Sequence, residues 1–234
     1  MEVPVPYPID SSFISKSFIS KNVSKSAAAS KNESTSCKQN QRRFQKRKPA
    51  SLMPLVFCSF FLLCTSFISQ ASADQNAAEL PELFSALKAA GSASQARQVE
   101  SEIWLKWLDT QNDKTADLLQ RVLDSMSAGE LDDALSASTE IIESDPEFAE
   151  GWNKRATVYY LMGRYDESVR DIHRTLQLEP RHFGAISGLG LIFLRTGDLP
   201  AALDAFRKVL DISPQSANAR RSVAQVESEL DDKI

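Results

Sequence analysis

Apolar side chains recur at helical spacing in the central part of the chain, interrupted at regular places by glycine and proline. In residues 152–161 bulky and small side chains follow a helical spacing, and Gly163 then supplies a turn residue that lacks a Cβ atom. A second such segment covers residues 165–178, and Pro180 follows it, where proline cannot extend a helix and suits the start of the next one. The pattern therefore predicts a helix, a turn and a second helix as one unit.

This unit recurs with a period of 34 residues. Three kinds of residue mark the period, namely prolines, glycines seventeen positions before each proline, and small residues between them: Pro146, Pro180 and Pro214; Gly129, Gly163 and Gly197; Ala134, Ser168 and Ala202. A unit of this length cannot bury its apolar face alone, so repetition indicates a stack of helical hairpins.

These columns resemble the tetratricopeptide repeat (TPR). Its signature positions are filled by Trp152, Ala156, Tyr159, Ser168 and Pro180. The resemblance covers residues 115–216 and implies an all-α fold, a TPR α-solenoid of antiparallel helix hairpins. We expect repeats at 115–148, 149–182 and 183–216, closed by a capping helix at 217–232.

A further helical hairpin is expected at residues 79–112. Gly91, Ala96 and Ile103 lie thirty-eight residues before Gly129, Ala134 and Ile141, so the same helix pair recurs with a longer loop. The range can be interpreted as a degenerate first unit of the stack or as an N-terminal cap, and both predict helices. Trp104 and Trp107, three residues apart, indicate a core or a seam between hairpins.

The first 73 residues are typical of a targeting leader. Residues 1–50 are predicted to be a disordered, transit-peptide-like leader, because from Ser11 onward they are rich in Ser, Lys and Asn. Residues 51–73 are predicted to be a hydrophobic signal or anchor segment: the apolar run 52–68 follows a basic cluster and ends in small residues suited to cleavage after Ala73. If residues 52–68 are not cleaved, they instead tether the protein to a membrane.

The two signals in series resemble the bipartite presequences of proteins imported into the chloroplast thylakoid lumen. Residues 152–160 and 178–185 are also similar to exported TPR proteins of proteobacteria, in agreement with a lumenal address. The lumen is therefore the expected location, with a membrane-anchored or mitochondrial protein as the alternatives.

Charge and cysteine content narrow the function. Residues 1–73 carry a net charge of +7 and residues 74–234 a net charge of −11, so the acidic repeat region argues against nucleic-acid binding. All three cysteines lie before residue 74, and neither His173 nor His182 belongs to a ligand cluster. We expect no enzyme activity, no catalytic residues, no cofactor and no metal.

The TPR resemblance implies a groove, lined by the first helix of each unit, that binds a protein or peptide partner. The residues expected to line it are Leu123, Met126, Asn153, Lys154, Thr157, Tyr160, Ser187, Leu191, Leu194 and Arg195. We hypothesise a short partner segment with apolar anchors and at least one carboxylate, the latter facing Lys154 and Arg195. For each residue the alternative is packing against the neighbouring repeat. The favoured function is a scaffold or adaptor, for instance an assembly factor, and the alternatives are a permanent structural subunit and a membrane-tethered scaffold.

Overall fold

The computed structural model describes residues 78–232, and within this range the chain is helical, with no strand. The predicted leader, residues 1–50, and the predicted signal or anchor segment, residues 51–73, lie outside the described residues. The helices are α2 (Leu80–Ala89), α3 (Ala93–Leu108), α4 (Asp113–Ala128), α5 (Leu131–Ser144), α6 (Ala149–Leu161), α7 (Tyr165–Leu178), α8 (Phe183–Thr196), α9 (Leu199–Ile212) and α10 (Ala217–Asp231).

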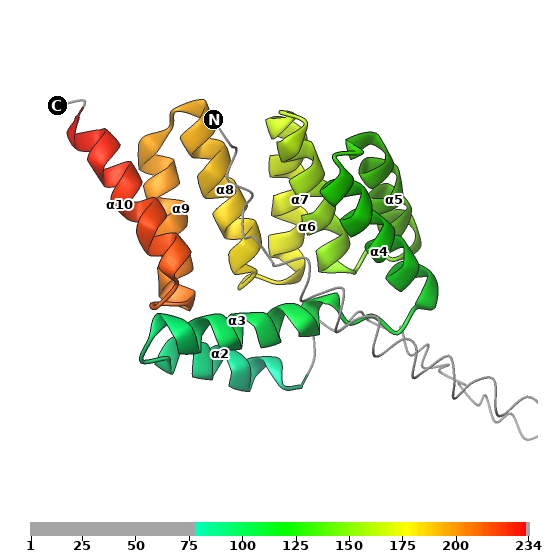
Figure 1. Cartoon of the computed structure of the whole chain (residues 1–234), viewed down its shortest axis with the longest axis horizontal. Coiled ribbons are helices and arrows are strands. Elements are labelled where there is room, and N and C mark those ends of the chain that lie inside the picture. The colour runs from blue at the N-terminus through cyan, green and yellow to red at the C-terminus, as the bar shows by residue number, and fades with distance from the viewer. Residues whose placement is uncertain (1–77, 233–234) are drawn as a thin grey trace, which may run out of the picture. The chain divides into compact units, whose positions relative to one another are not determined.

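Helices α4 to α9 form three antiparallel hairpins that stack side by side, and α10 packs on α9 (Figure 1). The pairs α6/α7 and α8/α9 fall within the predicted repeats 149–182 and 183–216. The pair α4/α5 matches the predicted repeat 115–148 except that α4 begins two residues earlier, at Asp113. The prediction of an all-α solenoid of helix hairpins is confirmed. The first helices of the units are also neighbours, because α6 contacts both α4 and α8. We call the surface formed by α4, α6 and α8 the first-helix face.

The repeated glycines turn the chain between the two helices of each hairpin. Gly129, Gly163 and Gly197 have φ angles of 76°, 74° and 84°, in the left-handed region. Side chains other than glycine are strained in this region, which explains why the same residue recurs at each turn.

The small-residue column marks where the paired helices approach each other. Ala134, Ser168 and Ala202 are fully buried, and the hydroxyl of Ser168 donates a hydrogen bond of 2.7 Å to the carbonyl oxygen of Ala156. In the last unit a Cβ atom on Gly190 would lie 2.6 Å from the ring of Phe206. The small residues therefore recur because a larger side chain at these positions would keep the two helices of a hairpin apart.

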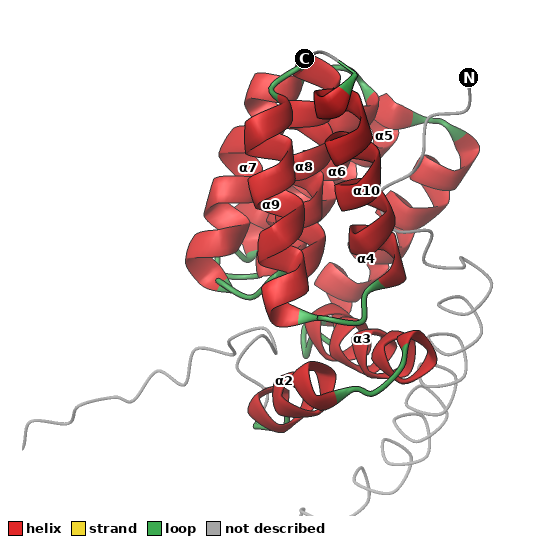
Figure 2. Ribbon diagram, turned by 90° about the vertical axis from the view of Figure 1, so that its left-hand side faces the viewer, coloured by secondary structure: helices red, strands yellow, loops and turns green. Residues whose placement is uncertain are grey.

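The hairpin of α2 and α3 does not stack in series with the repeats. It lies crosswise beneath the upright helices, with α2 in contact with α9 and α3 in contact with α6 (Figures 1 and 2). The interpretation of residues 79–112 as a further stacked unit is therefore wrong. The physical reason is the aromatic face of α3, where Trp104 and Trp107 pack on the turn that begins α8.

Candidate partner-binding face

The residues predicted to line the groove divide into two groups along the first helices. Those in the later turns of α4, α6 and α8 are mostly half-buried or exposed: Leu123, Met126, Thr157, Leu191 and Leu194 are half-buried, Arg195 is exposed, and Tyr160 is 7% exposed. Those in the earlier turns are buried: Asn153, Lys154 and Ser187. We call the first group the open end of the first-helix face.

A buried ion pair lies in the early turns of α6. The Nζ atom of Lys154 is 2.6 Å from Oε1 of Glu150, and the side-chain amide of Asn153 donates a hydrogen bond of 3.1 Å to Oε2. Burial acts to raise the pKa of Glu150, but the charge of Lys154 and the hydrogen bond from His182 outweigh it and lower this pKa to about 2. The charge of Lys154 is therefore already compensated within the chain.

His182 joins this pair to the start of α8. Its Nδ1 atom accepts a hydrogen bond of 3.0 Å from the backbone N–H of Ala185 and so caps the helix. Because Nδ1 is an acceptor, the ring proton is assigned to Nε2, which donates to Oε2 of Glu150 at 2.9 Å. The ring is fully buried, and it orients the turn between the second and third units.

Two tryptophans of α3 cover this network. The ring of Trp107 stacks on His182 with centroids 4.2 Å apart, and Trp104 meets the same imidazole edge-on at 5.3 Å. The ammonium of Lys154 lies 5.3 Å from the centroid of Trp104, within range of a cation–π interaction. We call Trp104, Trp107, Glu150, Lys154 and His182 the tryptophan junction.

The junction closes one end of the first-helix face. In α8 the junction involves the first turn. Measured from Gly184 at 1.5 Å per residue, Leu191, Leu194 and Arg195 lie about 10 to 17 Å further along the helix axis. The expectation that Lys154 faces a partner carboxylate is therefore wrong, since Glu150 and Trp104 take up its charge. Glu150 precedes Lys154 by four residues, a spacing that favours an ion pair on a helix and was visible in the sequence.

The open end presents a different arrangement around Arg195. The rings of Tyr160 and Tyr165 are tilted against each other with centroids 5.8 Å apart. A hydrogen bond with Tyr165 and the nearby Tyr160 raise the pKa of Arg195 above its ordinary value. Among the described residues Arg195 makes no ion pair with a carboxylate, although the repeat region is acidic.

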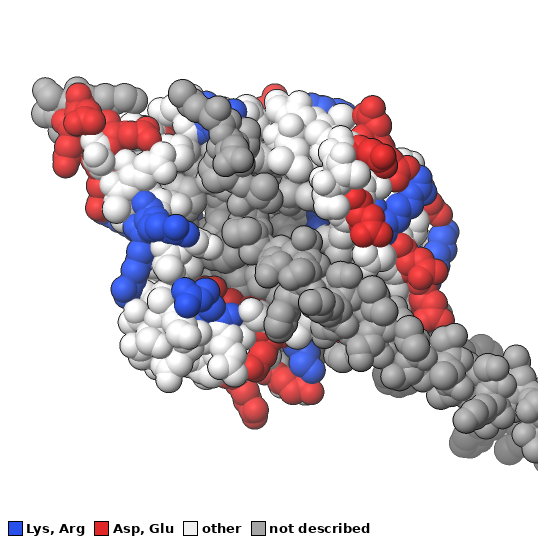
Figure 3. All heavy atoms as spheres, in the orientation of Figure 1, with Lys and Arg blue, Asp and Glu red and all other residues white. Residues whose placement is uncertain are grey.

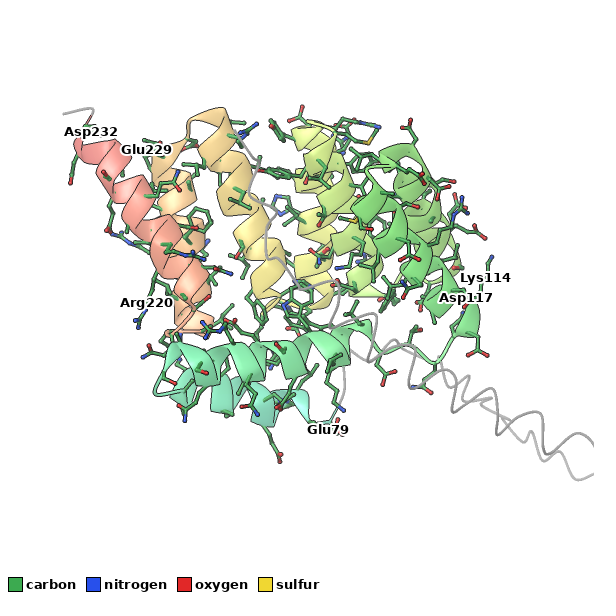
Figure 4. All side chains as sticks on the ribbon, viewed as in Figure 1. Glu79, Lys114, Asp117, Arg220, Glu229 and Asp232 are labelled. Atoms are coloured by element: carbon green, nitrogen blue, oxygen red, sulfur yellow. The ribbon has the colours of Figure 1, made fainter. Side chains whose placement is uncertain are left out.

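Charged side chains also gather at the two ends of the repeat array. In Figure 3 acidic groups cover the α4/α5 side and the free end of α10. In Figure 4 Asp117 on α4 and Glu229 and Asp232 near the end of α10 project outward from the helices. Within residues 78–232 no group of three or more His, Cys, Asp or Glu side chains could hold a metal ion.

Helical hairpins in series, with their first helices on one face, define an α-solenoid repeat protein. The chain matches the tetratricopeptide repeat family at residues 119–171 and 154–217. It is 32% identical over 194 residues to a TPR repeat-containing protein of Rhizobium etli, a match that covers 77% of this chain and 93% of the relative. The protein therefore belongs to the TPR repeat family, whose modules are generally non-enzymatic and mediate protein interactions.

Other similarities cover a smaller share of the chain. The chain is 31% identical over 101 residues to human DnaJ homolog subfamily C member 3, and this match spans 43% of the chain but only 20% of that relative. The solved first TPR domain of Spaghetti (RPAP3), bound to an HSP90 peptide, has a TM-score of 0.48 and 19% identity over 50% of this chain and 94% of that domain. The MamA protein has a TM-score of 0.46 and 17% identity over 63% of this chain and 78% of its own.

Proposed function

We propose that this protein is an adaptor that binds a segment of a partner protein on the open end of its first-helix face. The observation that carries this proposal is the set of half-buried apolar side chains there: Leu123, Met126, Leu191 and Leu194. Covering the remaining exposed area of such a leucine contributes about 1 kcal/mol, so a few of them support a specific contact. Repeat arrays of this class take extended peptides or helices on this face.

Substitutions on α8 test this proposal directly. Leu191→Asp and Leu194→Asp place a charge on the proposed contact surface while leaving the tryptophan junction intact. Ser136→Asp is a matched control, because Ser136 is exposed on α5, in the second helix of its unit. Tagged full-length variants are expressed in the native cells, and co-purified proteins are quantified by mass spectrometry.

The expected result is at least a tenfold loss of one or more partners from the α8 variants, with Ser136→Asp unchanged. A partner set that is the same for all three variants and the wild type would exclude this surface as the binding site.

We propose further that the adaptor works in the thylakoid lumen. The support is the order of the leader: a Ser- and Lys-rich stretch, a basic cluster, an apolar run and small residues at 71–73. The similarity to the Rhizobium etli protein covers a larger share of the chain than residues 78–234 make up, so it extends upstream of residue 78. Within residues 78–232 no helix is long and apolar enough to cross a membrane.

The N-terminus and intact mass of the native protein from fractionated cells test this location. A chain that begins near Asp74 in the soluble lumen supports the proposal. A chain that retains residues 52–68 in a membrane fraction favours a tethered scaffold, and recovery from mitochondria contradicts the address.

We propose that the interaction is transient, as in assembly of a larger complex. Native gel migration separates this from a permanent structural subunit. A transient adaptor migrates near the mass of its own chain, whereas a subunit co-migrates at high mass and is depleted when its partners are lost.

A further inference from the structure

The open end carries one positive charge, that of Arg195, which makes no ion pair within the described chain. Arg195 is exposed, and Tyr165 on α7 and Tyr160 on α6 raise its pKa. Several other arginines of the repeats do have carboxylate partners: Arg155 has Asp171 at 2.7 Å and Arg174 has Glu147 at 2.7 Å. Within the described chain the guanidinium of Arg195 thus remains available to an anion.

The helix dipole explains in part why an arginine stands at position 195. Arg195 lies in the last turn of α8, where a cation is favoured by the helix dipole. Tyr165 and Tyr160 act on Arg195 as well, since both raise its pKa, and each carries a hydroxyl group. The same arrangement suits a carboxylate, since a guanidinium and a hydroxyl both donate hydrogen bonds to it.

The apolar surface next to Arg195 fixes the spacing of what can bind. Leu191 lies one helical turn before Arg195, so their Cβ atoms are about 5–6 Å apart on the same side of α8. In an extended peptide, residues i and i+2 point to the same side about 6–7 Å apart. In a helical partner the matching pair would be i and i+3 or i and i+4.

We infer that the partner is a protein segment that contains an acidic residue, Asp or Glu, which pairs with Arg195, and an apolar residue, which packs on Leu191. In an extended segment these two partner residues are two positions apart, and in a helical segment they are three or four positions apart. This inference rests on the proposed function, because it assigns the chemistry of the same surface. The acidic residue of the partner contacts Arg195 at the open end and does not contact the tryptophan junction. Charge complementarity supports it, since the cation has no counterion among the described residues of an acidic repeat region.

A random 12-residue peptide display library, selected on the full-length protein, tests the inference without a known partner. The enriched sequences are expected to contain an acidic residue at one of these spacings from Leu, Ile, Met or Phe. The best peptide is then labelled with fluorescein, and its affinity is measured by fluorescence anisotropy for the wild type, Arg195→Ala, Arg195→Lys and Arg170→Ala. Arg170 is a matched control, since it is exposed on α7 and makes no ion pair within the described chain.

The expected result is a loss of affinity of about tenfold for Arg195→Ala, partial recovery for Arg195→Lys and no change for Arg170→Ala. Replacing the peptide's acidic residue by its amide should cause the same loss in the wild type and no further loss in Arg195→Ala. Peptides that depend on Leu191 but bind Arg195→Ala as tightly as the wild type would overturn the inference and leave the proposed function standing. Peptides that bind the Leu191→Asp variant as tightly as the wild type would overturn both the inference and the proposed function.

Discussion

The indole of Trp104 lies against the backbone of Gly184 so closely that a Cβ atom on Gly184 would meet the ring at 2.7 Å. The two residues are eighty positions apart, and their contact helps to place α3 across the start of α8. At the corresponding positions of the earlier units the chain has Ala116 and Glu150, which carry side chains. The missing side chain at Gly184 therefore gives the ring of Trp104 room to approach the start of α8.

The first prediction follows from this contact. Gly184→Ala forces the ring of Trp104 to move, and we expect it to lower the free energy of unfolding by about 1–3 kcal/mol, although alanine favours the helix. Urea unfolding followed by tryptophan fluorescence measures the effect. The control is Gly188→Ala on the same helix, where the Cβ atom would meet only the terminal methyl group of Ile172, at 3.3 Å. Equal effects for the two variants would show that docking does not depend on the missing side chain.

The second prediction concerns His182, which both caps α8 and stacks on Trp107. His182→Ala removes the cap, the stacking and the hydrogen bond to Glu150, and we expect a loss of about 2–4 kcal/mol of stability. His182→Asn keeps a side-chain oxygen that can cap the helix, so it should recover about 1 kcal/mol of this loss. Thermal unfolding and the near-ultraviolet circular dichroism of the tryptophans measure both variants. If the alanine variant were as stable as the wild type, the imidazole would be dispensable for the junction.

The repeat array could be predicted from the sequence because its determinants are local and recur. Gly163 turns the chain and Ser168 allows two helices to approach, and the same demands return every 34 residues. The position of the α2/α3 hairpin could not be predicted in this way. It depends on contacts between residues distant in sequence, such as Trp104 with Gly184, and its own pattern of glycine and small residues matches that of a stacked unit.

The candidate site was predictable to a similar extent. Repeat register identified the side chains that the first helices present, and Leu191 and Arg195 lie where the register places them. Register alone does not show which charges are already compensated. Lys154 and Arg195 are both cations that the register places on this face, but only Lys154 has a buried carboxylate beside it.

The third prediction concerns the pH dependence that Glu150 confers. Its pKa is about 2 in the folded protein, against an ordinary value of 4.5, so the folded state favours the ionised form. The resulting stability is fully present above pH 4.5 and is lost as the pH falls toward 2. Glu150→Gln should abolish this part of the pH dependence, which urea unfolding across that pH range measures.

At neutral pH Glu150→Gln leaves Lys154 buried without its counter-charge. We expect this to lower the free energy of unfolding by about 3–5 kcal/mol. Adding Lys154→Met to Glu150→Gln should restore most of it, because the double variant buries no unpaired charge. A double variant no more stable than Glu150→Gln would mean that the ion pair is not the source of the loss.

The fourth prediction has the opposite sign and concerns Glu100 on α3. This side chain is 6% exposed, and burial raises its pKa although the hydroxyl of Ser213 donates a hydrogen bond of 2.8 Å to it. A carboxyl group with a raised pKa favours the protonated form in the folded protein, so it costs stability once the pH rises above its ordinary value of 4.5.

Glu100→Gln keeps an oxygen that accepts from Ser213 but removes the buried charge. We expect it to leave stability unchanged at pH 4 and to increase it by up to about 1 kcal/mol at pH 7. Glu102→Gln, an exposed neighbour on the same helix, should change stability at neither pH. A loss of stability at pH 7 as large as that of Glu150→Gln would show that the Glu100 anion itself is needed, with Arg97, whose charge acts on this carboxyl group, as its counter-charge.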